Sequence, residues 1–173
     1  MIVVTGSKLT KIASAAIDII PTDRFCGVLR KADPMKLVPP TLEQIDVLMP
    51  FISKFEKAGF STGKWEIKEG HFPWFNHDEA VTDFIKVLYD NNWITSAFNW
   101  TEWKDSAKKY IDSPKAIRSA DSVTIQKLFT THVRSDRFCE GHLASMFESG
   151  HILALLHRLQ EIRKEMIQES GDE

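Results

Sequence analysis

The sequence predicts an all-α or mainly α fold, a single-domain helical bundle with room for one small β-hairpin. Apolar residues recur at helical spacing through most of the segment 41–168, and capping residues precede several of these helical stretches. Alternating apolar residues between Gly and Pro occur around residues 60–75, which is typical of a loop or a small hairpin. A chain of 173 residues is long enough to bury one core without disulfides.

The domain boundaries follow from where this helical pattern starts and stops. We expect an N-terminal arm with a short helix over residues 1–40, a helical domain over residues 41–168 and a disordered tail over residues 169–173. The end of the arm, residues 21–40, contains four prolines, which interrupt helices. The core is therefore expected to fold from Thr41 onward.

Composition limits the classes of partner. Hydrophobic residues make up 43% of the chain and charged residues 27%, which is typical of a folded soluble protein. The net charge of −2 provides no general attraction to nucleic acid or to anionic lipid. Only two cysteines occur, and residues 12–20 are too short to span a membrane, so we expect a cytoplasmic protein without membrane association. No metal ion and no other cofactor are expected.

The first elements of the predicted domain are a divided helix and a hairpin. Thr41 and Gln44 have the spacing of a capping box, so a helix begins there. Pro50 splits or kinks this helix because it removes a backbone hydrogen bond, and Gly59 ends it. The hairpin over residues 60–75 follows.

The remaining elements are helices. Asn76 and Glu79 suggest a cap for the third helical segment, Asn99 a cap for the fourth, and Asp121 a cap for the helix that follows the short turn or helix at Pro114. These segments carry apolar stripes: Val81, Phe84, Ile85, Leu88, Tyr89; Trp100, Trp103, Ala107, Tyr110; Ile125, Leu128, Phe129, His132, Val133. Gly150 precedes a last long helix.

The stretch HVRSDRFCEGH, residues 132–142, concentrates the chemistry of the chain. Arg134 and Arg137 lie one helical turn apart, and their guanidinium forks match carboxylate or phosphate. We therefore predict that an anionic ligand or a protein partner binds here. The residues expected to line this site are Thr131, Arg134, Asp136, Arg137, Glu140, His142, Trp100 and Trp103.

Two other interpretations of this stretch remain open. In one, the two arginines pair with Asp136, Glu140 or Glu148 and the stretch is an internal strut of a structural interaction module. In the other, the protein is a hydrolase of a phosphoester or nucleic acid, in which His132, His142, Asp136 or Glu140 act as acid and base. Gly141 is explained by a bend or a close helix approach.

Nucleophilic, metal and nucleic-acid sites are weaker alternatives. Cys139 and His142 are three residues apart and could meet as a thiolate–imidazolium pair, but a cytosolic Cys is more often a buried hydrophobe. The same spacing supplies only two zinc ligands. Basic residues outnumber acidic ones over residues 104–137, next to Trp100 and Trp103, but we favour a solvated helix face over a nucleic-acid surface. The oligomeric state is not predicted.

The chain after its first forty residues resembles a prokaryotic family of domains of unknown function, number 6508. The resemblance covers about residues 41–160 and includes a T-x-x-x-R-x-D-R-F-x-x-G-x-L pattern. The matching residues are Trp100, Trp103, Ala120, Asp121, Thr130, Arg134, Asp136, Arg137, Phe138, Gly141, Leu143, Gly150, Arg158 and Leu159. The resemblance implies a module built around the stretch 132–142, and it implies no activity.

Overall fold

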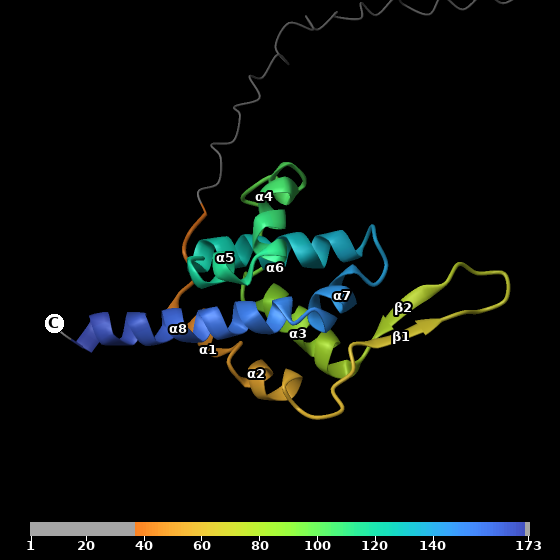
Figure 1. Ribbon diagram of the computed structural model, residues 1–173, viewed down its shortest axis with the longest axis horizontal. Coiled ribbons are helices and arrows are strands. Elements are labelled where there is room, and N and C mark those ends of the chain that lie inside the picture. Colours follow the sequence, from red (N-terminus) through yellow and green to blue (C-terminus); the bar gives the residue numbers. More distant parts are fainter. Residues whose placement is uncertain (1–36, 172–173) are drawn as a thin grey trace, which may run out of the picture. The chain divides into compact units, whose positions relative to one another are not determined.

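The computed structural model describes residues 37–171, and in them helices pack around one hydrophobic core beside a single hairpin (Figure 1). The mainly α fold is therefore confirmed for this part of the chain. The expected arm and its short helix lie almost wholly outside the described residues. The elements are α1 Leu42–Asp46, α2 Pro50–Phe55, β1 Gly63–Glu66, β2 Trp74–His77, α3 Glu79–Asp90, α4 Trp100–Asp112, α5 Pro114–Arg118, α6 Ser122–Asp136, α7 His142–Glu148 and α8 His151–Gly171.

The first helical segment is divided as predicted. The Thr41 hydroxyl accepts from the Gln44 N–H at 3.3 Å, and the Gln44 side chain accepts from the Thr41 N–H at 2.8 Å, which completes the capping box. Pro50 is the first residue of α2, where its missing N–H costs nothing. The chain thus starts two short helices in place of one long helix.

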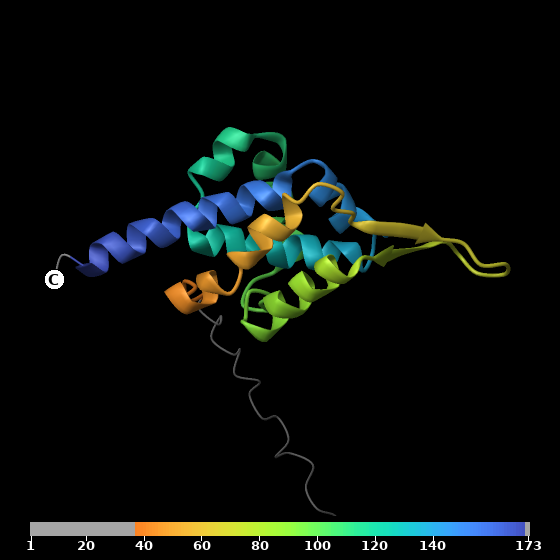
Figure 2. The same cartoon turned by 90° about the horizontal axis from the view of Figure 1, so that it is seen from below.

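The predicted hairpin is present, and β2 extends to His77. The strands pair antiparallel, with Gly63 opposite His77 and Glu66 opposite Trp74. Gly63 has a φ of 135°, and a Cβ there would lie 2.1 Å from the Asn76 carbonyl oxygen, so only glycine fits. Both views show the hairpin extending away from the helices (Figures 1 and 2).

The helix caps are confirmed with one exception. Asn99 accepts from the Thr101 N–H at 3.2 Å, and Asp121 accepts from the Thr124 N–H at 2.7 Å. The predicted cap at Asn76 is wrong, because Asn76 pairs within β2 and Asp78 is the residue before α3. Pairing between strands, which local sequence does not reveal, moved the start of that helix.

The core lies between α6, α8 and the first helices. The largest fully buried side chain is Trp93, in the connection between α3 and α4, and its indole N–H donates to the Gln44 carbonyl at 2.9 Å. Phe55, Phe84 and Phe147 meet edge to face and join α2, α3 and α7.

The last helix differs from the expected boundary. α8 continues to Gly171, past the expected end of the helical domain at residue 168. Its helical hydrogen bonds propagate from a half that packs against the core. Within residues 37–171, none of the helices combines the length and the apolar character that crossing a membrane requires.

Candidate functional site

The stretch 132–142 forms the end of α6, a tight turn and the start of α7. The N–H groups of Phe138 and Cys139 both donate to the Ser135 carbonyl, at 3.0 and 2.9 Å, so the helical path continues briefly beyond Asp136. Gly141 then reverses the chain with a φ of 76°. A Cβ on Gly141 would lie 3.0 Å from the Trp65 ring. The predicted bend is therefore present, and the close neighbour belongs to the hairpin instead of a helix.

Asp136 joins three elements through its two carboxylate oxygens. Oδ2 accepts from His77 Nε2 at 2.8 Å, and Oδ1 accepts from the Leu143 N–H at 2.8 Å. The hydrogen bond to Asp136 raises the pKa of His77 above its ordinary value in spite of burial. Burial by itself raises the pKa of Asp136, but the hydrogen bonds from His77 and Leu143 bring it below its ordinary value. This carboxylate is thus held in a structural role.

Glu140 is a second link between this stretch and the hairpin. Its Oε2 accepts from the Phe75 N–H at 3.0 Å, beside the edge-to-face pair of Trp65 and Phe75. Asp136 and Glu140 therefore act as a strut, which agrees with part of that interpretation. Their contacts hold the hairpin against the turn between α6 and α7, and they do not involve the arginines.

The two arginines lie away from these carboxylates. Arg137 is exposed, its Nη2 donates to the Tyr89 hydroxyl at 3.0 Å, and its guanidinium lies 6.0 Å from the Tyr89 ring centre. Arg134 is half-buried, and its guanidinium makes no hydrogen bond or ion pair with another residue in 37–171. The pairing with Asp136, Glu140 or Glu148 that the strut interpretation requires is absent from the described part of the chain.

Aromatic side chains flank the arginines on the side of α4. Phe138 is 81% exposed and stacks on Trp100, with ring centres 6.0 Å apart and planes inclined by 25°. Trp103 is half-buried against the core, and Lys127 lies over its ring at 5.7 Å. Thr131, which we expected in the site, is buried and donates its hydroxyl to the Lys127 carbonyl at 2.8 Å. Thr131 is therefore oriented inward, away from a surface ligand.

Three histidines from different helices meet beneath the turn: His132 of α6, His142 of α7 and His151 of α8. His132 Nδ1 lies 3.1 Å from His142 Nε2, and the His132 and His151 rings meet edge to face at 5.0 Å. His132 is fully buried, as its place on the apolar stripe predicts. His142 stacks on His132 and also lies close enough to Asp136 and Lys104 for both charges to act on its ring.

Burial controls the charge of this histidine cluster, His132, His142 and His151. Desolvation lowers the pKa of all three imidazoles, to about 4 for His151 and well below the ordinary value for His132. The neighbouring imidazoles add to the effect at His132, whereas Asp136 opposes it and Lys104 supports it at His142. The Nε2 atoms of His132 and His151 have no hydrogen-bond partner among the described residues. The cluster is neutral at pH 7.

The positions of these side chains argue against the nucleophilic, acid–base and metal sites that were considered as alternatives. His142 Nε2 is directed at His132, and no hydrogen bond joins its ring to the exposed Cys139 within residues 37–171, so a thiolate–imidazolium pair is not formed. Asp136 and Glu140 are already bonded to the hairpin, which removes two expected acid–base groups. In the same described range, no group of His, Cys, Asp and Glu is arranged to hold a metal ion.

Sequence reasoning missed His77 and His151. His77 is 59 residues from Asp136 along the chain, and no local pattern links the two. His151 follows the Gly150 turn, and only the packing of α8 on α6 brings it to His132.

Fold and site together define a mainly helical domain in which Asp136 and Glu140 bind the hairpin, whereas Arg137 contacts Tyr89 of α3. The chain belongs to the family of unknown function DUF6508, whose sequence model matches residues 40–165. No curated protein matches the chain, and no solved structure matches it.

Proposed function

We propose that this domain binds an anionic ligand or partner through Arg134 and Arg137, in a prokaryotic cytoplasm. One observation carries the proposal: the acidic and the basic side chains of the stretch 132–142 have different partners. Asp136 and Glu140 are bonded to the hairpin, whereas Arg134 and Arg137 make no ion pair with a described carboxylate. The two guanidiniums therefore keep most of their donors for a ligand.

The direction of the side chains supports this separation. Arg134 and Asp136 are two residues apart on α6, so they lie on nearly opposite faces of the helix, about 160° apart. Arg137 follows Arg134 by one turn, and residues at that spacing are neighbours on the helix surface. An anion that contacts both arginines would therefore not meet the carboxylate of Asp136.

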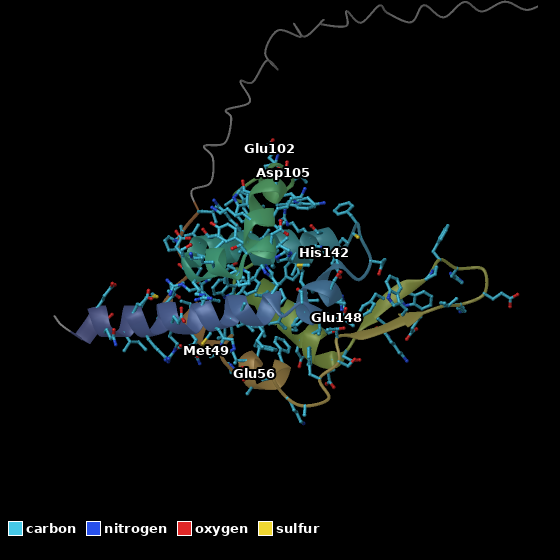
Figure 3. All side chains as sticks on the ribbon, viewed as in Figure 1. Met49, Glu56, Glu102, Asp105, His142 and Glu148 are labelled. Carbon is cyan, nitrogen blue, oxygen red and sulfur yellow. The ribbon has the colours of Figure 1, made fainter. Side chains whose placement is uncertain are left out.

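The surrounding charges favour an anion as well. Lys104 of α4 is close enough to lower the pKa of His142, and Lys127 lies over Trp103 on the same helix as Arg134. The acidic residues Glu102 and Asp105 lie on the outer side of α4, away from α6 and His142 (Figure 3). Along the segment 104–137 basic residues outnumber acidic ones although the whole chain carries −2.

The partial burial of Arg134 favours the binding of an anion. Arg134 is half-buried, and a partly desolvated cation without a partner is unfavourable. Each charge-assisted hydrogen bond to phosphate or carboxylate contributes about 1.5–3 kcal/mol.

The test compares lysine substitutions at the site with one outside it. Arg134→Lys and Arg137→Lys keep the charge and remove the fork, and Arg118→Lys on α5 is a matched exposed control. Inorganic phosphate, at ionic strength balanced with chloride, should raise the melting temperature of the wild type and of Arg118→Lys, and should raise it less in the two site variants. An equal response in all four proteins, or none in any, contradicts the proposal.

A further inference from the structure

Phe138 directly follows Arg137 in the chain, and its exposed ring is not explained by the packing of the core. A large apolar side chain that is 81% exposed gains little from burial, yet Phe138 is held against Trp100 in a parallel stack. Trp100 contacts the phenyl ring on one side, and most of the surface of the ring remains open to solvent. Phe72, which is 92% exposed at the tip of the hairpin, stacks on no aromatic ring of the described chain. Phe138 is thus an oriented platform, and Phe72 is not.

The platform and the arginines share one turn of helix. Arg137 has helical dihedral angles, and the Phe138 N–H still bonds to the Ser135 carbonyl, so residues 134, 137 and 138 follow helical spacing. Residues three and four apart on a helix have Cβ atoms about 5–6 Å from each other. Arg134 is therefore the helical neighbour of both Arg137 and Phe138, three and four residues away, and lies between them on the helix surface.

Tyr89 of α3 contacts the guanidinium of Arg137. Its hydroxyl accepts from Arg137 Nη2, and its ring lies under the Arg137 guanidinium at 6.0 Å. These contacts orient the planar guanidinium and leave its remaining N–H groups for a ligand. The turn thus offers donors for a tetrahedral anion beside an apolar plane for an aromatic ring.

We propose that the anion bound by Arg134 and Arg137 is the phosphate of a nucleotide unit whose base stacks on Phe138. This inference rests on the proposed anion site and goes beyond it, because it names the second half of the ligand. Aromatic platforms beside cationic side chains are how proteins hold unpaired bases without reading their sequence. The nucleotide is either free or part of a single strand, and both present the same phosphate and base.

The experiment separates the base from the phosphate. The full-length protein is titrated calorimetrically with inorganic phosphate, ribose 5-phosphate, adenosine monophosphate and a single-stranded hexanucleotide. Stacking of one base on an aromatic ring should make adenosine monophosphate bind between about fivefold and a hundredfold more tightly than ribose 5-phosphate. Phe138→Ala should abolish this difference and retain binding of phosphate. Phe72→Ala, which removes an equally exposed phenyl ring, should leave the difference unchanged.

Each outcome decides between the two proposals. If ribose 5-phosphate binds and the base adds nothing, the nucleotide is excluded and the anion site stands. If none of the four ligands binds, both proposals fail. If an acidic hexapeptide binds as tightly as the hexanucleotide, the ligand is a protein partner and the nucleotide is again excluded. A hexanucleotide that binds more tightly than the mononucleotide identifies a single strand as the source, and equal affinity per site identifies the free nucleotide.

Discussion

His77 Nε2 lies 2.8 Å from Asp136 Oδ2, and this contact fastens the hairpin to the end of α6. The same carboxylate accepts the Leu143 N–H at the start of α7. One side chain therefore fixes the relative positions of a strand and two helices, and the two arginines of the proposed site lie next to it, Arg134 in the last turn of α6 and Arg137 directly after that helix.

Asp136→Ala should destabilise the domain by about 1–3 kcal/mol, because it leaves the Leu143 N–H and the His77 ring without their acceptor. Urea unfolding measures the loss, and hydrogen exchange should accelerate at the strand amides of the hairpin. Asp105→Asn, which touches only an exposed ion pair with Lys108, is the control and should cost almost nothing. If Asp136→Ala unfolds at the same urea concentration as the wild type and its hairpin amides exchange no faster, Asp136 does not fasten the hairpin to α6.

The cost of Asp136→Ala should also depend on pH. Because the folded pKa of His77 is raised, its stabilising contribution is fully present below the unfolded value of 6.5 and is lost as pH rises through the folded value. The variant should therefore lose more stability relative to wild type at pH 6 than at pH 9. Denaturation curves at the two pH values measure this, and a pH-independent cost would show that His77 contributes no charge.

The histidine cluster should make the whole domain acid-sensitive. The folded pKa values of His132, His142 and His151 are lowered, so the unfolded chain takes up protons first and stability falls as pH drops below 6.5. For His151 the loss of stability is at most about 1.4 kcal/mol per pH unit between 6.5 and its folded pKa of about 4. The contribution of His77 does not change this decline, because it is already fully present below pH 6.5.

A pair of variants on α8 tests the source of that acid sensitivity. His151→Gln should flatten the decline in unfolding free energy between pH 6.5 and 4.5, because one buried titrating group is gone. His157→Gln, which changes a half-exposed imidazole bonded to Glu56, should leave the slope near that of wild type. Equal slopes in all three proteins would mean that the cluster does not titrate as described.

Gly141→Ala should cost more stability than Gly150→Ala. Both glycines have positive φ, 76° and 73°, so alanine brings a backbone cost of about 1–2 kcal/mol at each. Only at Gly141 would the new Cβ also press on the Trp65 ring, at 3.0 Å. The melting temperature of Gly141→Ala should therefore be lower than that of Gly150→Ala. Adding Trp65→Ala should narrow this difference in melting temperature. A gap that survives the removal of Trp65 would refute the close contact.

The sequence by itself determined those features that local hydrogen bonds and periodicity control. The capping box at Thr41, the break at Pro50, the caps at Asn99 and Asp121, and the buried stripe that includes His132 all depend on residues a few positions apart. Helical spacing also predicts that Arg134 and Arg137 share a surface.

Only the tertiary structure decided which element covers each face of α6. Asp136 binds His77 across 59 residues of sequence, and Glu140 binds Phe75 across 65, so no local rule separates these carboxylates from the neighbouring arginines. The meeting of His132 with His151 and the shift of a helix start from Asn76 to Asp78 have the same origin. Packing and strand pairing bring together groups that are distant in the chain, and the energy of those contacts outweighs local preference.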